Sequence, residues 1–190
     1  MKYVFGVLIL SLLFGCANSI KELSNADKDT YLISGDEIAS NAQAILLQNV
    51  SQAMKAGGVI NAVNFCSENA IPLTDSISTL HAKSIQRLSD RNRNPINALK
   101  SGIDQKAWAE IRASMTDSTK AKHLILQEEN SVYYYKAISI AMPTCLKCHG
   151  DQTVDIDPKA LKIINEKYPE DKATGYKMGD LRGLWKIKMN

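Results

Sequence analysis

The segment Cys145–His149 carries the clearest chemical signal in the chain. Cys145 and Cys148 are separated by two residues, and His149 follows directly, which is the spacing of a c-type haem attachment sequence. Two thiols one helical turn apart can each form a thioether with one vinyl group of the same porphyrin. The adjacent imidazole can then bind the iron as its proximal ligand. The sequence therefore predicts one covalently bound haem c.

Two other interpretations of this motif fit less well. A zinc ion takes four protein ligands in a structural site, and this segment offers at most three. A thioredoxin-like pair would lie in a βαβ unit, and the chain has no such pattern. The N-terminus also has the pattern of an export signal, and an exported chain would reach the compartment in which c-type haems are assembled.

The second axial ligand of the iron is less clear from the residues alone. The candidates are a cysteine, two histidines and two methionines: Cys66, His81, His123, Met115 and Met142. Met142 lies on the proximal side of the motif, and Met115 on an amphipathic segment is typical of a core residue. Cys66 has no partner once the other cysteines are assigned. It is equally consistent with an iron ligand and with a small buried hydrophobic residue.

Arginines lie close together in the middle of the chain. Arg87, Arg91 and Arg93 could neutralise haem propionates through paired hydrogen bonds. A solvated basic loop is the alternative for each of them. Of these, Arg91 and Arg93 are our candidates for propionate binding.

The N-terminus has the pattern of an export signal. Lys2 precedes an apolar run that is too short to span a bilayer and ends at small residues. Residues 1–15 are thus expected to be a signal peptide, followed by Cys16 in a sequence that resembles a bacterial lipobox. Ordinary cleavage after Ser19 is the alternative. Under the lipoprotein interpretation Cys16 carries a membrane anchor, and Ala17 after it favours the outer membrane, with the protein facing the periplasm.

Composition limits the class of protein. The chain has 190 residues, 45% of them hydrophobic and 23% charged, with a formal net charge of +3. These values indicate one globular domain and give no support for nucleic-acid binding, which needs a concentrated basic face. Residues 16–33 are polar and aperiodic and are expected to form a tether. The folded domain is then expected to cover residues 34–190.

Periodicity predicts helices first and antiparallel strands later, which favours an α+β fold. Helices are expected from Ser34 or Asp36 to Gly57-Gly58, over 59–68, from Pro72, over 104–115 and over 158–167. Strands are expected over 83–89, 123–127, 132–138 and 184–189, with a hairpin turn at 128–131.

Several segments together resemble one protein family. They are Cys66 with Ala70, Asn94-Pro95-x-Asn97, the haem motif with Gly150, and the C-terminal run Tyr168-Pro169-x-Asp171-x-Ala173-x-Gly175-Tyr176-x-x-Gly179-Asp180-x-Arg182-Gly183. This pattern, spread over residues 36–188, is similar to that of single-haem c-type proteins with a PAS-like fold, first described in cyanobacteria. The resemblance implies an antiparallel sheet flanked by helices, with haem c in a cleft. It also implies that Cys66 is the distal iron ligand.

The resemblance and the motif together suggest two functions. The first is redox or small-gas sensing by a haem with His and Cys ligands, read by a signalling partner whose identity is unknown. The second is electron transfer by a monohaem cytochrome with an unknown redox partner. An enzyme is not expected, because the sequence shows no recognisable distal acid or base for a haem peroxidase.

Overall fold

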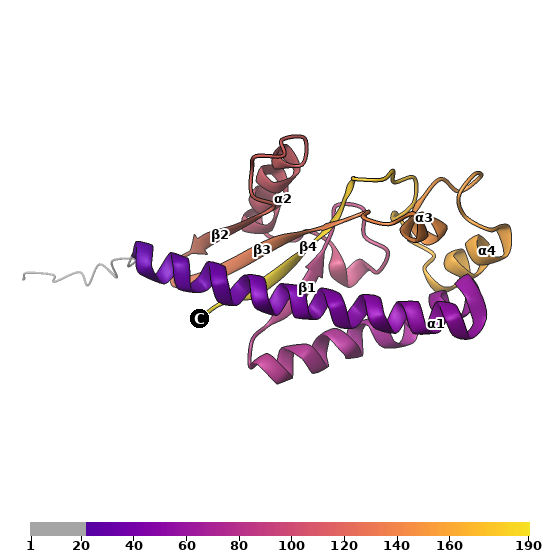
Figure 1. The fold of residues 1–190 in the computed structure, drawn as a ribbon, viewed down its shortest axis with the longest axis horizontal. Coiled ribbons are helices and arrows are strands. Elements are labelled where there is room, and N and C mark those ends of the chain that lie inside the picture. Colours follow the sequence, from indigo (N-terminus) through magenta and orange to yellow (C-terminus); the bar gives the residue numbers. More distant parts are fainter. Residues whose placement is uncertain (1–21) are drawn as a thin grey trace, which may run out of the picture.

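The computed structural model describes residues 22–190 and has an α+β fold, as the sequence predicts. Its elements are α1 (Asn25–His81), β1 (Ile85–Leu88), the 3-10 helix η1 (Pro95–Asn97), α2 (Gly102–Ser114), β2 (His123–Glu128), β3 (Ser131–Ser139), α3 (Pro143–His149), α4 (Pro158–Lys167) and β4 (Leu181–Lys188) (Figure 1). The expected signal peptide and Cys16 lie outside the described residues. Within residues 22–190, no helix combines the length and apolar character needed to cross a membrane.

Helix α1 begins earlier than the sequence suggests. The Ser24 side chain caps it by accepting a hydrogen bond from the Asp27 backbone N–H at 3.1 Å. Leu23, Tyr31 and Leu32 pack against the main hydrophobic core. The expectation of a tether up to residue 33 is therefore wrong from Asn25 onward, because contacts with the sheet stabilise a helix that its own polar sequence does not indicate.

Two glycines bend α1 into a helical hairpin. Gly57 and Gly58 have non-helical backbone angles, and Gly58 has a φ of 71°, which favours glycine. Asn61 donates a side-chain hydrogen bond to the Ala53 carbonyl at 2.8 Å and so satisfies a carbonyl exposed by the bend. The predicted end at these glycines is confirmed. The predicted helix start at Pro72 is wrong, since Pro72 lies inside the second half of α1.

The four strands form one antiparallel sheet in the order β1-β4-β3-β2. Strands β2 and β3 are joined by a tight hairpin at Glu129 and Asn130, as predicted, and Glu129 adopts a positive φ of 53° there. The C-terminal strand β4 lies between β1 and β3 and pairs with both. Arg87 of β1 faces Trp185, and Lys136 of β3 faces the same residue from the other side.

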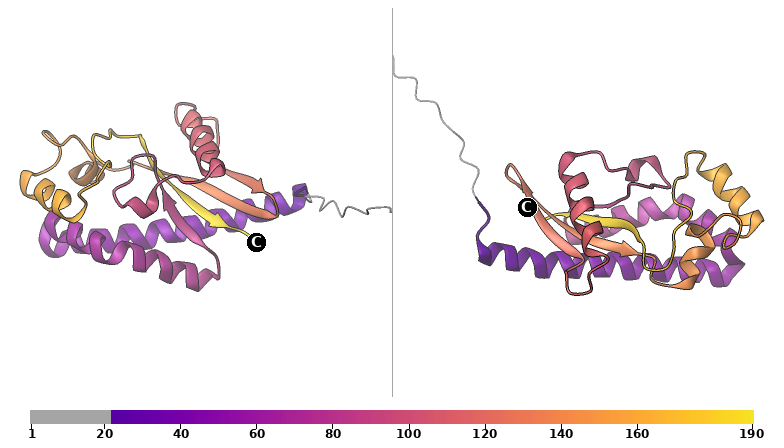
Figure 2. Two further views of the ribbon diagram at one scale, coloured as in Figure 1. Left: turned by 180° about the vertical axis from the view of Figure 1, so that it is seen from behind. Right: turned by 90° about the horizontal axis from the view of Figure 1, so that it is seen from above.

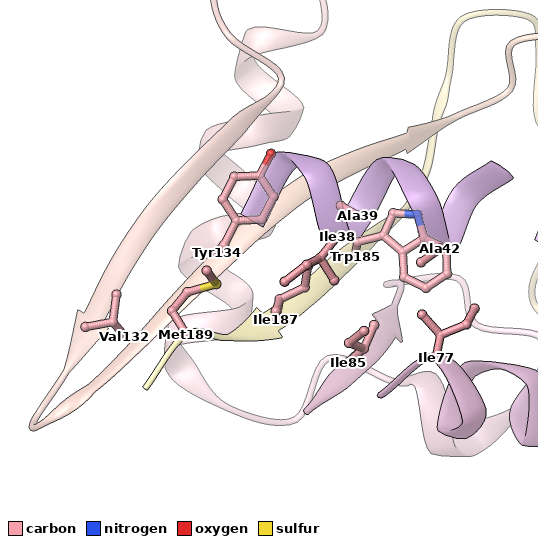
Figure 3. Close-up of a cluster of buried hydrophobic side chains, with 10 residues drawn as sticks. All are labelled: Ile38, Ala39, Ala42, Ile77, Ile85, Val132, Tyr134, Trp185, Ile187 and Met189. Atoms are coloured by element: carbon pink, nitrogen blue, oxygen red, sulfur yellow. The ribbon is translucent and has the colours of Figure 1, made fainter. Parts of the chain in front are cut away.

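Helices cover both faces of the sheet (Figure 2). On the α1 face, Trp185, Ile187 and Tyr134 pack against the helix in the largest cluster of buried side chains (Figure 3). On the opposite face, α2 packs against a second cluster that includes Tyr135 and Leu184. Neighbouring residues of β3 thus enter different cores, because successive side chains of a strand point to opposite faces.

Helices α3 and α4 lie at the end of the molecule where α1 bends (Figure 1). A third cluster joins Val63 of α1 to Ile156 and to Ile164 of α4. This arrangement brings the second half of α1, which carries Cys66, beside the helix that carries the Cys145–His149 motif.

Candidate haem-binding site

Helix α3 presents the two motif cysteines as free thiols. Pro143 begins the helix, where its missing N–H is harmless. Cys145 packs against the cluster of Ile140, Ala173 and Tyr176, whereas Cys148 packs against the cluster that joins α1 to α4. Burial, the largest effect, raises the pKa of Cys148 to about 11. Both thiols are therefore half-buried, unpaired and one turn apart on the same helix.

The His149 imidazole is held by one of its two nitrogens. Nδ1 lies 2.8 Å from the Ala173 carbonyl oxygen. A carbonyl can only accept, so Nδ1 carries the proton and Nε2 keeps its lone pair for a metal. Burial, followed by the charges of Arg182 and Arg93, lowers the pKa of His149 well below 6.5. The ring is therefore neutral at physiological pH and could bind a metal through Nε2.

A loop after α4 completes the C-terminal end of α3. The backbone N–H groups of Gly175 and Tyr176 donate to the carbonyls of Gly150 and His149, at 2.6 and 2.9 Å. Such bonds satisfy carbonyls that a helix end leaves unpaired. Gly150 is required by space, because a Cβ there would lie 2.7 Å or less from Asp155 and from the Leu146 carbonyl.

Arg93 forms hydrogen bonds to two other segments at this end of the molecule. Its guanidinium binds the Asp171 carboxylate through two hydrogen bonds, of 3.2 and 3.0 Å, and donates to the Cys148 carbonyl at 2.6 Å. The side chains of Arg93 and Asp171 are 12% and 5% exposed. The loop after β1 is thus fixed to both α3 and the segment after α4.

Cys66 lies in the same neighbourhood, on the second half of α1. Val63, one turn earlier, shares a cluster with Cys148, and the Cys66 thiol interacts electrostatically with Arg87 and Arg93. Burial raises the pKa of Cys66 despite these two cations. The structure therefore brings Cys66 together with Cys148, which lies far away in the sequence.

The site holds more positive than negative charge. Within residues 22–190, Arg93 has a carboxylate partner, but neither Arg87 nor Arg182 forms an ion pair. Burial lowers the pKa of Arg182 to about 10, so it stays charged at neutral pH. The Arg87 Nε–H is buried and has no hydrogen-bond partner. Buried charges and donors are costly without a partner, so this site suits an anionic group.

These residues fit haem c. The free thiols of Cys145 and Cys148 match its vinyl groups, the imidazole of His149 matches its iron, and the surplus cations match its propionates. The fit rests on this donor set and its charge. Two cavities of about 380 and 500 Å³ lie elsewhere, one near Tyr31 and Asn190 and one against α4.

Comparison with known proteins gives the family. A model of the Tll0287-like family matches residues 22–190. The chain belongs to the Tll0287-like family. The fold is similar to the crystal structure of the cyanobacterial haem protein Tll0287, with a TM-score of 0.57 and 21% sequence identity over 80% of this chain and 91% of that one. No curated protein matches the chain. The resemblance inferred from the motifs is thereby confirmed.

In this Tll0287-like chain, the other candidates for the distal ligand have other partners. His81 contacts the Asn41 side chain at 3.2 Å. His123 lies 3.9 Å from Asp36 and packs against Tyr134. Met115 joins the core beneath α2, as its pattern indicates, and Met142 is 43% exposed before α3. The ligand role of Cys66 stays a prediction.

The propionate candidates also already have protein partners. Arg93 pairs with Asp171, and Arg91 stacks 4.0 Å from the centre of the Tyr176 ring. Propionate binding by Arg91 and Arg93 stays a prediction. The unpartnered Nε of Arg87 supports the same role for Arg87, which the sequence also suggested.

Sequence reasoning assigned no role to Asp171, Ala173 or Arg182. All three lie in the C-terminal run that carries the family resemblance, and that run was the available signal. Ala173 acts through its backbone carbonyl, and no residue type could reveal that contact.

Proposed function

We propose that this chain is a monohaem c-type protein, with thioether bonds at Cys145 and Cys148 and His149 as the proximal iron ligand. The observation that carries this proposal is the His149 ring, whose Nδ1 is bonded to the Ala173 carbonyl while two free thiols stand on the same helix. The solved relative Tll0287 is a haem protein, which supports it. We also propose that the fold is PAS-like and that it holds haem c in a cleft.

The test is covalent attachment. The chain is expressed with a c-type haem maturation system, denatured and weighed intact. We expect the wild-type chain to carry the added mass of one haem. The fraction of chains with this added mass should fall in C145A and in C148A and should be zero in C145A/C148A. A denatured wild-type chain without haem would end the proposal. C66A serves as the control, because this cysteine lies outside the attachment motif.

We propose Cys66 as the distal ligand. It lies beside α3 on a separate element, and the resemblance to the family supports the assignment. Absorption and EPR spectra of the ferric wild type, C66A and C66M would decide it. Loss of the thiolate-type low-spin signals in both variants is expected. Unchanged spectra would remove Cys66 from the iron.

For the biological role, we propose redox or small-gas sensing. Haem c supplies a one-electron couple and, when an axial position is free, a binding site for a diatomic gas. Cys66 sits on the half of α1 that follows the bend, and the other half of the helix packs along the sheet. A change in the position of Cys66 could thus be transmitted along α1 to a signalling partner.

The alternative is electron transfer to a redox partner. One observation favours it: α3 lies at the surface, with exposed residues from Met142 to Thr144 beside the first thiol. Spectra in both oxidation states, with and without CO, discriminate the two roles. Loss of Cys66 on reduction, followed by CO binding, supports sensing. Unchanged ligation and no CO complex support a carrier. Neither role makes the chain an enzyme.

We further propose an exported lipoprotein that faces the periplasm from the outer membrane through Cys16. The signal pattern of residues 1–15 and the compartment of c-type haem assembly support this location. Membrane fractionation of the full chain beside C16A tests it. The wild type should sediment with membranes and C16A should not. Equal membrane association of the two would contradict the lipid anchor.

A further inference from the structure

Arg182 approaches the proximal histidine closely. Its Nε lies 3.3 Å from His149 Nδ1. Because Nδ1 donates its proton to the Ala173 carbonyl at 2.8 Å, the two nitrogens that meet are both donors. Their contact is therefore the approach of a cation to a neutral ring rather than a hydrogen bond.

The guanidinium is fixed in this position. Ser89, which is 2% exposed, accepts a hydrogen bond from Arg182 Nη1 at 3.2 Å, and its own hydroxyl donates to the Arg182 carbonyl at 2.9 Å. Nη1 also lies 3.4 Å from the Arg91 carbonyl. The Tyr176 ring lies edge-on to His149 and 5.5 Å from the Arg182 guanidinium carbon. The charge cannot easily move away from the imidazole.

In the part of the chain that the structure describes, Arg182 has no carboxylate of its own. Asp171 acts on it only at longer range and is itself paired with Arg93. Within residues 22–190, Arg182 has no ion-pair partner, and Nδ1 of His149 is bonded to a neutral carbonyl rather than to a carboxylate. A carboxylate there would increase the negative character of the ring and its donation to a metal. A buried cation has the opposite effect, and its influence is strong where water is excluded.

We propose that Arg182 is a positioning residue that acts through His149 to raise the reduction potential of the iron. The inference rests on the proposed function. Ferric iron carries one more positive charge than ferrous iron, so a fixed cation beside the proximal ring disfavours the ferric state. In this family member Arg182 opposes the stabilisation of ferric iron that an anionic thiolate from Cys66 provides.

The test is a spectroelectrochemical titration of the holoprotein with dithionite as reductant and ferricyanide as oxidant. The variants are R182Q, which removes the charge, R182K, which keeps it, and S89A, which frees the guanidinium. R112Q is the matched control, because Arg112 is an exposed arginine on α2. Haem content and ferric spectra are recorded for each variant.

We expect R182Q to lower the equilibrium constant for one-electron reduction about tenfold, or about 59 mV. S89A should shift it in the same direction by a smaller amount, while R182K and R112Q stay close to the wild type. A wild-type potential in both R182Q and S89A would overturn the proposal. An equal shift of the potential in R182K and R182Q would also overturn it, because the shift would then come from the changed side-chain packing and not from the lost charge. A wild type without covalent haem would instead refute the proposed function.

Discussion

Arg93 and Asp171 form a two-point ion pair between the loop after β1 and the segment after α4. Their side chains are almost fully buried, and Arg93 also donates to the carbonyl of Cys148. Asp171 further accepts from the Ala173 backbone N–H at 2.8 Å, so the same carboxylate helps to place the carbonyl that holds His149.

Replacing Asp171 by Asn should strongly destabilise the fold. D171N leaves the Arg93 charge buried without its carboxylate, and we expect a loss of about 3 kcal/mol in the free energy of unfolding. Urea denaturation of the holoprotein measures it. The control is E166Q, because Glu166 pairs with Lys162 on the exposed face of α4 and should contribute about 0.5 kcal/mol or less. If D171N and E166Q lowered the free energy of unfolding equally, the buried pair of Arg93 and Asp171 would not stabilise the fold more than an exposed pair does.

Asp104 predicts a specific dependence of stability on pH. It is buried and accepts hydrogen bonds from Tyr135 and Lys186, each at 2.7 Å. Burial raises the pKa of Asp104, but the bonds from Lys186, Ser101 and Tyr135 outweigh this, and its pKa lies below the usual 3.8. Because the folded state lowers this pKa, the carboxylate stabilises the protein above about pH 4, and that contribution is lost as the pH falls further.

D104N isolates this contribution. We expect the variant to be less stable than the wild type at pH 7, and the difference to shrink between about pH 4 and pH 2. Thermal unfolding across this pH range would measure it. A difference that stays constant with pH would mean that the charge of Asp104 does not stabilise the fold.

Gly35 predicts a steric effect at the contact between α1 and the sheet. A Cβ at this position would lie 2.4 to 2.8 Å from atoms of the Tyr134 side chain, which is fully buried. We therefore expect G35A to destabilise the protein by about 1–3 kcal/mol. G102A is the matched control, since a Cβ there meets nothing within 4 Å. Chemical denaturation should separate the two, and similar stabilities would refute the close approach.

Two prolines should respond differently to replacement by alanine. Pro72 lies inside α1, where a proline removes a helical hydrogen bond, whereas Pro158 occupies the first turn of α4. We expect P72A to stabilise the protein by about 1–2 kcal/mol, and P158A to be neutral or slightly destabilising. Thermal unfolding of both variants provides the measurement. A destabilised P72A would indicate that the proline is needed at that position in α1.

Local sequence patterns predicted most of the elements. Helix α4 and strands β1 to β4 appear within a few residues of their expected positions, because turn residues and side-chain periodicity report local backbone preferences. Helix α3 and the 3-10 helix η1 were not among the expected elements. The early start of α1 and its continuation through Pro72 arise where packing against the sheet outweighs local preference.

The sequence by itself determined the candidate donors of the site: two cysteines one turn apart, an adjacent histidine and one further cysteine. Only the tertiary structure decided what surrounds them. It placed Cys66 beside α3 through the bend in α1, bonded His149 to the Ala173 carbonyl, and set Arg182 against the ring. These relationships join segments that are far apart in the chain. Backbone carbonyls and long-range charges leave no periodic trace in a sequence, so spacing alone could not reveal them.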